Sequence, residues 1–240
     1  MTAPPRLSVV IPAFNEAIRL PPYLDEVVGF LEGRGEPYEV VVVDDGSTDA
    51  TATAVEALAA RHPAVRLLPL GRNRGKGAAG RAGMLAAAGA ARLFTDADGA
   101  TPIAELKRLE PALASGADIA IGSRVLLDPA VAVRTRRHRV AAGRVFNWLV
   151  ARLGLRGVAD SQCGFKLFTA AAAEALFGAL ETAGFAFDVE LLLRAQAAGY
   201  RIVEVPVNWA DQEGSKVGVL RSGPGMVMQI LRARRRIGRR

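Results

Sequence analysis

The sequence predicts an α/β fold in which a single, Rossmann-like and mostly parallel sheet is flanked by helices. Half of the 240 residues are apolar, which is enough for a sizeable core. Short β-branched runs alternate with longer helical patterns through the first half of the chain. The runs are apolar throughout, which is typical of strands in a parallel sheet that is covered on both faces.

The elements follow one another in a regular order as far as residue 124. Strands are expected at residues 7–11, 38–45, 65–70, 91–96 and 117–123. Helices are expected at about 21–31, from a cap at Ser47, Thr48 and Asp49 to about His62, at about 75–90, and after Pro102. The alternation then stops. Helices near 139–153, 169–178 and 187–198 and a strand at 201–207 complete the compact part.

Composition and charge narrow the possible functions. The single cysteine, Cys163, excludes an internal disulfide. No run approaches the roughly 18 to 20 apolar residues that span a bilayer, and the first residues show no signal-peptide pattern, so we expect a cytoplasmic protein. Six arginines lie among the last nine residues and five between Arg134 and Arg144, which predicts anionic partners. Aromatic residues are too few for base stacking, so no nucleic-acid partner is expected.

The segment FTDADGATP, residues 94–102, contains two carboxylates, Asp96 and Asp98, just after a predicted strand. A divalent cation binds closely spaced oxygen ligands and often takes substrate phosphates in its remaining positions. Residues i and i+2 leave a strand on the same side, so both carboxylates can face one ligand while Ala97 points away. The alternative is helix capping, because Thr101 and Pro102 precede a helical pattern.

Other polar groups also stand at the ends of predicted strands. They are Asn15 and Glu16 after VVIPAF, Asp44 and Asp45 after VVVV, and Arg124 after IAIGS. Ligands of parallel sheets bind beyond the carboxyl ends of the strands, so these positions favour one binding site. Asn15 and Glu16 could also form a simple turn, and one of the two aspartates could be a helix cap.

The segment GRNRGKGAAGRAG, residues 71–83, is rich in glycine and basic residues ahead of a helix. Its amides and cations can cradle phosphate, although the P-loop spacing is absent. Its glycines can alternatively serve close packing of a helix on the sheet. Arg124 can bind a diphosphate through two parallel hydrogen bonds.

Together these motifs resemble glycosyltransferase family 2 with the GT-A fold. Within it, the resemblance is to the dolichyl-phosphate or polyprenyl-phosphate hexose transferases, above all the β-glucosyltransferase type. The matching segments, in the expected order over nearly the whole chain, are VVIPAFNE, VVVDDGSTD, RNRGKGAAGRAGM, FTDADGATP, GSR, DSQCGFKLF, FAFDVELL, VEVPVNW and SK. The resemblance implies a GT-A domain at 1–220, with a nucleotide-sugar half at about 1–124 and an acceptor half at about 125–220. A basic amphipathic tail at 221–240 would follow.

The resemblance also implies roles for the matching residues. The nucleotide sugar would be bound by Pro12, Ala13, Asn15, Glu16, Asp44, Asp45, Lys76, Asp96 and Ala97. Mg²⁺ or Mn²⁺ would be held by Asp96 and Asp98. The acceptor phosphate would be bound by Arg124, Arg139, Gln162, Lys166, Ser215 and Lys216, with Asp188, Glu190 and Trp209 on the same side. Asp98, Arg124 and Asp188 would act in catalysis, although a buried ion pair of Lys166 with Asp188 is the structural alternative.

The implied reaction moves a hexose, with inversion, from a nucleoside-diphosphate sugar to a polyprenyl or dolichyl phosphate, at the cytoplasmic face of a membrane. Mannosyl relatives usually have DADLQHP where this chain has DADGATP, which favours UDP-glucose over GDP-mannose. A polysaccharide or soluble acceptor stays open. A sugar nucleotidyltransferase is less favoured, because PAFNE stands where a Gly-rich, Arg-containing loop would follow the first strand.

The C-terminal segment after Pro224 predicts an amphipathic helix. Met226, Ile230 and Ile237 fall along one side, and arginines dominate the final turns. Such a helix can lie in the headgroup layer of an anionic membrane. The alternative is a surface helix whose apolar side packs on the domain.

Overall fold

The computed structural model describes residues 4–135, 137–212 and 219–238. Its main sheet has seven strands in the order β3-β2-β1-β4-β7-β5-β8. They are β1 (Leu7–Ala13), β2 (Tyr38–Asp44), β3 (Val65–Pro69), β4 (Ala91–Thr95), β5 (Ile119–Ser123), β7 (Phe165–Thr169) and β8 (Ile202–Pro206). Neighbouring strands are parallel except at β7, which runs antiparallel to both β4 and β5. The mostly parallel sheet predicted from the sequence is therefore confirmed.

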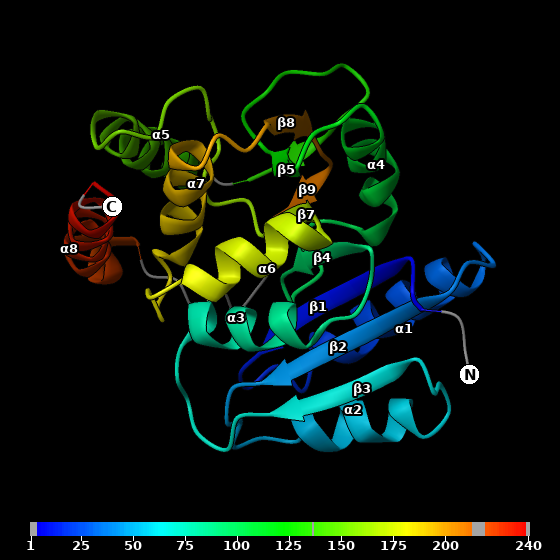
Figure 1. Cartoon of the computed structure of the whole chain (residues 1–240). Helices are drawn as coiled ribbons and strands as arrows, with labels where there is room; N and C mark the ends of the chain where they lie inside the picture. Colours follow the sequence, from blue (N-terminus) through cyan, green and yellow to red (C-terminus); the bar gives the residue numbers. More distant parts are fainter. Residues whose placement is uncertain (1–3, 136, 213–218, 239–240) are drawn as a thin grey trace.

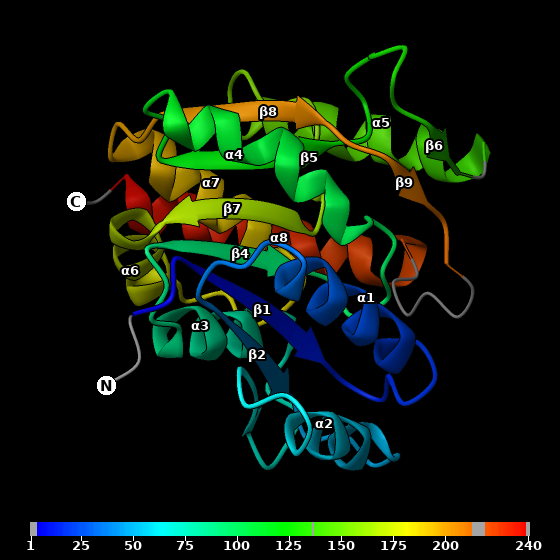
Figure 2. The same ribbon diagram turned by 90° about the vertical axis from the view of Figure 1, so that its right-hand side faces the viewer.

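Helices cover both faces of the sheet, so the molecule has three layers (Figures 1 and 2). One face carries α1 (Leu20–Glu32), α2 (Thr51–Ala59), η1 (Ile103–Glu105) and α4 (Leu106–Ala114). The other carries α3 (Lys76–Ala86), α6 (Ala170–Ala179) and α7 (Phe187–Ala197), with α5 (Arg137–Arg152) and α8 (Val219–Ile237) outside α7. Side chains alternate across each strand, so Val9 and Ile11 enter one core cluster and Val10 the other.

One edge of the sheet gathers the strand ends that matter for a binding site. The parallel strands β1, β2, β4, β5 and β8 all finish there. Because β7 is antiparallel, its first residue and the preceding residues 160–164 lie at this same edge. A small sheet of β6 (Val133–Arg134) and β9 (Trp209–Ala210) joins the segments that follow β5 and β8. The backbone N of Ala210 also donates to the carbonyl oxygen of Ala100, 2.9 Å away, beside the acidic motif.

The structure corrects several predicted elements in the first half and middle of the chain. β7, β6 and β9 were not predicted. α2 ends at Ala59 instead of near His62. Its first residue, Thr51, donates its backbone N to Asp49 Oδ1 at 3.0 Å, so Asp49 caps the helix as predicted. Ser47 and Asp49 also accept hydrogen bonds from the backbone N atoms of Asn15 and Ala17.

The C-terminal helix differs from its prediction in its start and in the use of its apolar side. α8 begins at Val219, before Pro224. Met226 and Ile230 are buried in the second core cluster and Ala233 is also buried, where α8 packs on α7. The prediction that the apolar side enters a headgroup layer is therefore wrong, because that side is already covered by protein. None of the helices in the described residues is long and apolar enough to cross a membrane.

Candidate active site

The loops after β1 and β2 form one rim of the site. The backbone N of Asn15 donates to Ser47 Oγ at 2.9 Å, and Asn15 Oδ1 accepts from the backbone N of Thr48 at 2.8 Å. The backbone N of Glu16 donates to Thr51 Oγ1 at 2.8 Å. Asn15 has a φ of 53°, a left-handed conformation that asparagine tolerates better than most residues. These contacts hold Asn15 and Glu16 against the loop after β2, which follows the predicted pair Asp44 and Asp45.

Asp44 and Asp45 are both buried and hold backbone amides. Asp45 Oδ1 accepts from the N of Arg74 at 2.7 Å, and Oδ2 accepts from the N of Gly75 at 2.9 Å. Asp44 accepts in the same way from the turn that follows it. Asp45 thereby fixes the loop that delivers Lys76 to the site. Contact of either aspartate with a nucleotide base stays a prediction, as does the binding role of Pro12 and Ala13, which are buried at the end of β1.

The predicted carboxylate pair lies just beyond β4. Lys76 Nζ is 2.5 Å from Asp96 Oδ1. Ala97 is buried in the first core cluster, so its side chain points away from the carboxylates as predicted and leaves only its backbone for a ligand. Asp98 Oδ1 accepts from the backbone N of Ala100 at 3.1 Å within its own turn, whereas the first residue of η1, Ile103, donates its backbone N to Glu26 Oε1 at 3.2 Å. The helix-capping interpretation therefore fails.

Arg19 is a site residue that the sequence reasoning missed. Its guanidinium pairs with the Glu16 carboxylate through Nε–Oε2 at 2.7 Å and Nη2–Oε1 at 2.5 Å. Arg19 Nη1 also lies 3.9 Å from Asp98 Oδ2. Arg19 therefore links the rim after β1 to the carboxylate pair. The signal that could have revealed it is a basic residue three positions after Glu16, next to a predicted helix start.

The carboxylate pair fits a divalent cation. Burial and the neighbouring Asp96 carboxylate raise the pKa of Asp98, because both disfavour its charged form, and a bound cation would offset this. A Cβ at Gly164 would overlap the Asp96 carboxylate, so glycine leaves the room that this carboxylate occupies. Among the described residues, no group of three or more His, Cys, Asp or Glu side chains could hold a metal ion. Phosphate oxygens and water would complete the coordination.

Lys166 and Asp188 form the buried ion pair that the sequence left open as an alternative. Lys166 Nζ lies 2.6 Å from Asp188 Oδ1 and donates to the carbonyl oxygen of Cys163 at 2.5 Å. The two side chains are 1% and 6% exposed. Burial raises the pKa of Asp188 more than Lys166 and Lys76 lower it. Lys166 and Asp188 therefore form an ion pair with each other. Contact of either residue with the acceptor stays a prediction.

Glu190 makes structural contacts, and its expected place on the acceptor side stays a prediction. It is fully buried and accepts hydrogen bonds from the backbone N atoms of Glu181 and Thr182 and from Arg194 Nε. These contacts fix the first turn of α7 against the segment before it.

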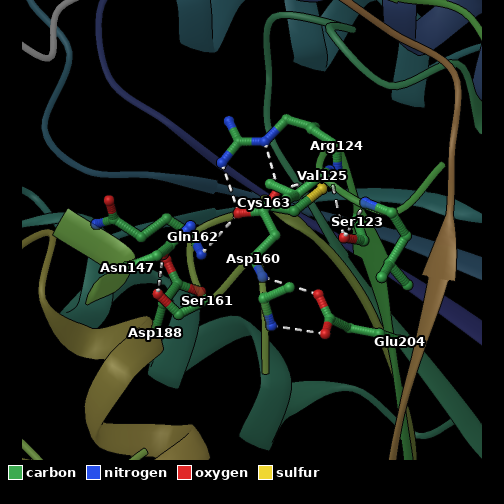
Figure 3. Close-up of polar contacts among 12 residues, drawn as sticks. Ser123, Arg124, Val125, Asn147, Asp160, Ser161, Gln162, Cys163, Asp188 and Glu204 are labelled. Carbon is green, nitrogen blue, oxygen red and sulfur yellow. Dashed lines mark hydrogen bonds and ion pairs between the residues drawn. The ribbon is translucent and has the colours of Figure 1, made fainter. Parts of the chain in front are cut away.

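Arg124 follows β5 and is bound by a residue that was not predicted (Figure 3). Asp160 Oδ2 lies 2.7 Å from Arg124 Nε, and Asp160 Oδ1 lies 2.8 Å from Arg124 Nη2. Gln162 donates its backbone N to Asp160, and the Trp209 ring lies 5.4 Å from Arg124 Cζ. The structure therefore brings Arg124, Gln162 and Trp209 together. Arg139 lies in α5, but its side chain, like the whole of Ser215 and Lys216, lies outside the described residues.

Gly77, Gly80 and Gly83, within residues 71–83, serve close packing, one of the two predicted uses. A Cβ at Gly77 would overlap the carbonyl oxygen of Thr182. A Cβ at Gly80 would lie 2.8 Å from Phe94, and one at Gly83 only 2.5 Å from Val10. α3 can therefore approach the sheet closely enough to place Lys76 beside the carboxylates. A phosphate cradle formed by this loop stays a prediction.

Solved structures of a glycosyltransferase superpose on this chain and show its fold. Glucosyl-3-phosphoglycerate synthase from Mycobacterium tuberculosis, in complex with Mn²⁺, UDP-glucose and phosphoglyceric acid, superposes with a TM-score of 0.74. The match covers 96% of this chain and 79% of that chain at 20% identity. The UDP complex of the same enzyme gives a TM-score of 0.72, with 96% and 80% covered at 20% identity. The fold is the GT-A type of glycosyltransferases.

Sequence comparison shows the family. Residues 8–177 match the model described as glycosyl transferase family 2. Curated proteins named dolichyl-phosphate beta-glucosyltransferase are 46% identical over 88% of the chain in Drosophila melanogaster and 39% identical over 95% in Dictyostelium discoideum. The matches cover 69% and 73% of those proteins. The chain belongs to glycosyltransferase family 2 and, within it, to the dolichyl-phosphate beta-glucosyltransferase family.

Proposed function

We propose that this protein transfers glucose from UDP-glucose to dolichyl phosphate or another polyprenyl phosphate, with inversion at the anomeric carbon. One observation carries the proposal: a carboxylate pair with an adjacent lysine and an arginine with outward N–H groups lie at one sheet edge. The names of the relatives support the lipid phosphate acceptor and the glucosyl group. The solved complex with Mn²⁺ and UDP-glucose supports the donor and a divalent metal.

The reaction forms a bond between a phosphate oxygen of the lipid and the anomeric carbon, and it breaks the bond from that carbon to the diphosphate. Mg²⁺ or Mn²⁺ held by Asp96 and Asp98 would supply Lewis-acid stabilisation of the leaving UDP. Lys76, paired with Asp96, adds a fixed positive charge beside the same group. Arg124 binds phosphate through the N–H groups that point away from Asp160.

The acceptor makes a strong general base unnecessary. A phosphate monoester has a second pKa of about 6, so most of it is already a dianion at neutral pH. A sugar hydroxyl would instead need a base within hydrogen-bond reach. Asp188 is already paired with Lys166 at 2.6 Å, which suits a carboxylate that positions groups.

Transfer assays test this function directly. The protein is incubated with radiolabelled UDP-glucose or GDP-mannose and with polyprenyl phosphate, with and without EDTA. We expect label from UDP-glucose in the organic extract, its loss with EDTA, and its return when Mg²⁺ or Mn²⁺ is added in excess. Label that stays in the aqueous phase, or that comes only from GDP-mannose, contradicts the proposal and favours a soluble acceptor or a mannosyl donor.

We further propose that the protein binds peripherally to the anionic cytoplasmic face of a membrane through the outer surface of α8. Arg232 and Arg235 are exposed on this helix, and Met228 is 52% exposed beside them. α8 contains no Asp or Glu. Each basic residue near an anionic surface contributes roughly 1 kcal/mol to binding. The arginine side, not the covered apolar side, would therefore meet the lipid.

α5 extends this surface, because it also lies outside α7 (Figure 1). Trp148 and Val145 are 59% and 67% exposed, and the guanidinium carbon of Arg152 lies 5.1 Å from the Trp148 ring. α5, too, contains no Asp or Glu. Tryptophan is enriched at membrane–water interfaces, and arginine favours anionic headgroups. Together the two helices would bring the acceptor edge close to a lipid phosphate.

A further inference from the structure

The Arg124 guanidinium is held along one edge and remains open along the other. Asp160 accepts from Nε at 2.7 Å, from Nη2 at 2.8 Å and from the backbone N of Arg124 at 3.0 Å (Figure 3). The Asp160 side chain is 1% exposed, whereas that of Arg124 is 30% exposed. The Asp160 carboxylate therefore lies inside the protein, and the Arg124 guanidinium lies at the surface of the site.

The open edge has the geometry that recognises phosphate. A guanidinium carries five N–H donors in a planar fork, and Asp160 uses only the Nε and Nη2 edge. Nη1 hydrogen-bonds to no other residue in the described part of the chain, so Nη1 and the outer N–H of Nη2 form a second fork. The Trp209 ring, 5.4 Å from Arg124 Cζ, limits tilting of the plane.

A second carboxylate holds Asp160 itself in place. Glu204, on β8, accepts from the backbone N of Ala159 at 2.7 Å and from that of Asp160 at 2.8 Å. Because β7 and β8 pair on opposite sides of β5, the loop before β7 is anchored across Arg124 to the far strand. The Arg124 pKa is raised, since the Asp160 contacts outweigh burial, so the guanidinium stays charged.

We propose that Asp160, anchored by Glu204, is a positioning residue that orients Arg124 so that its outer fork binds the phosphate of the acceptor. The inference rests on the proposed function, in which that acceptor is a lipid phosphate. Asp160 touches no reacting atom in this scheme. Its effect on the reaction passes through Arg124, which it holds by two side-chain contacts, more than through the Gln162 backbone N from which it also accepts at 3.3 Å.

A double-mutant cycle tests the inference. The variants are Asp160→Asn, Arg124→Ala and the two combined, assayed for glucose transfer to polyprenyl phosphate. We expect Asp160→Asn to raise KM for the lipid phosphate by about tenfold to a hundredfold and to leave KM for UDP-glucose within about twofold, since misplacing one group by about 1 Å can cost 10²-fold. In the Arg124→Ala background the same change should add little. Equal losses in both backgrounds, or a rise in KM for UDP-glucose alone, would overturn the proposal.

Glu39→Gln is the matched control. Glu39 also binds an arginine, Arg66, and a backbone amide, that of Ala88, but it lies in β2 away from the site edge. We expect this variant to keep both KM values even where its melting temperature falls. If Asp160→Asn does not fold, Glu204→Gln, which weakens the anchor of Asp160, takes its place with the same expected direction.

A measurement without turnover separates this inference from the proposed function. In ¹⁵N-edited NMR spectra, the Arg124 Nε–H should exchange slowly with water in the wild type, and its signal is assigned by its loss in Arg124→Ala. Asp160→Asn should make this exchange at least about tenfold faster. Unchanged exchange would show that Asp160 does not hold Arg124. If the exchange changes but the wild type gives no lipid product, the proposed function fails while the positioning contact stands.

Discussion

At the scale of single residues, Asp98 and Asp188 carry the same chemical group in different surroundings. Asp98 stands beside another carboxylate, and its pKa is raised by burial and by Asp96. Asp188 is paired with Lys166 at 2.6 Å. A carboxylate proposed to bind the metal and a carboxylate paired with lysine should respond differently to mutation.

We expect Asp98→Ala to lower kcat by on the order of 10³-fold, because it removes metal-based stabilisation worth several kcal/mol. Asp188→Asn should keep measurable turnover, because the proposed reaction needs no base. It should also destabilise the fold by about 3–5 kcal/mol, since Lys166 is left buried and unpaired. Initial rates normalised to the folded fraction from circular dichroism give the comparison. Equal loss of rate in the two variants would contradict the base-free mechanism.

Gly164 offers a test of the carboxylate pair that removes no charge. A Cβ at this position would overlap the Asp96 carboxylate, so Gly164→Ala should displace that carboxylate and weaken Mn²⁺ binding by at least about tenfold. Electron paramagnetic resonance of free Mn²⁺ measures this. Gly178→Ala, on α6 with no atom within 4 Å of the added Cβ, is the control and should bind Mn²⁺ like the wild type. Unchanged binding by Gly164→Ala would remove Asp96 from the metal site.

The pair of Arg124 and Asp160 predicts a pH dependence of stability. Burial raises the pKa of Asp160, but the hydrogen bonds and charge of Arg124 outweigh it, so the pKa is lower in the folded chain. A carboxyl of this kind stabilises the fold above its unfolded pKa of about 3.9, and the contribution is lost as pH falls through the folded value. Asp160→Asn should cost about 3 kcal/mol at pH 7. Urea unfolding should show this difference shrinking below about pH 4, and a constant difference would argue against the pair.

At the scale of elements, the close approach of α3 to the sheet places Lys76. Gly83 faces Val10 and Val43, where an added Cβ would lie 2.5 and 2.6 Å from methyl carbons. Gly83→Ala should therefore destabilise the protein by about 1–3 kcal/mol despite the better helix propensity of alanine. Gly29→Ala, on α1 with no atom within 4 Å, should instead stabilise by about 0.4–1 kcal/mol. Thermal unfolding measures both, and a stabilising Gly83→Ala would mean that α3 does not pack this closely.

The elements also show how far sequence patterns reach. Apolar runs such as LSVVI and YEVVVV predict buried parallel strands, because each contains enough β-branched residues to identify itself locally. The run FKLFT, which forms β7, does not predict a strand in this way, because it follows a polar turn. Its place between β4 and β5 depends on contacts with residues far away in the sequence. Asp160 was missed for the same reason: its partners Arg124 and Glu204 come from strands separated from it by more than 30 residues. Asp96, Asp98 and Arg124 were found because motif and strand end coincide, whereas Lys76, the first residue of α3, was found through the family resemblance.

At the scale of the whole molecule, the sheet order brings the nucleotide-sugar and acceptor halves predicted at about 1–124 and 125–220 into one structure. β7, from the second half, lies between β4 and β5 of the first. Lys166 on β7 pairs with Phe94 of β4 and Ile121 of β5 in the strand register. The carboxylates after β4 and the arginine after β5 are therefore separated by a strand of the other half. A change in β7 should affect both sides of the site at once.

The basic surface of α5 and α8 predicts membrane binding that depends on charge. Truncation before Arg232 would also remove Ala233, which is buried, so substitutions are the cleaner test. We expect Arg232→Gln with Arg235→Gln to weaken binding to vesicles containing anionic lipid roughly thirty-fold, from about 1 kcal/mol per arginine. Sucrose flotation with neutral vesicles should give little binding for any variant, and raising salt from 0.1 to 0.5 M should weaken wild-type binding.

The matched control for this surface is Arg61→Gln with Arg72→Gln, which removes the same charge from the far end of the sheet order, beside β3. This control should float like the wild type if the surface acts locally, because each arginine is felt only within about a Debye length of the lipid. Equal weakening in both double variants would mean that net charge alone drives adsorption and that α8 does not orient the protein. Trp148→Ala then tests the apolar contribution of the α5 surface to membrane binding. This substitution should change binding at high salt, where the charges of the arginines are screened.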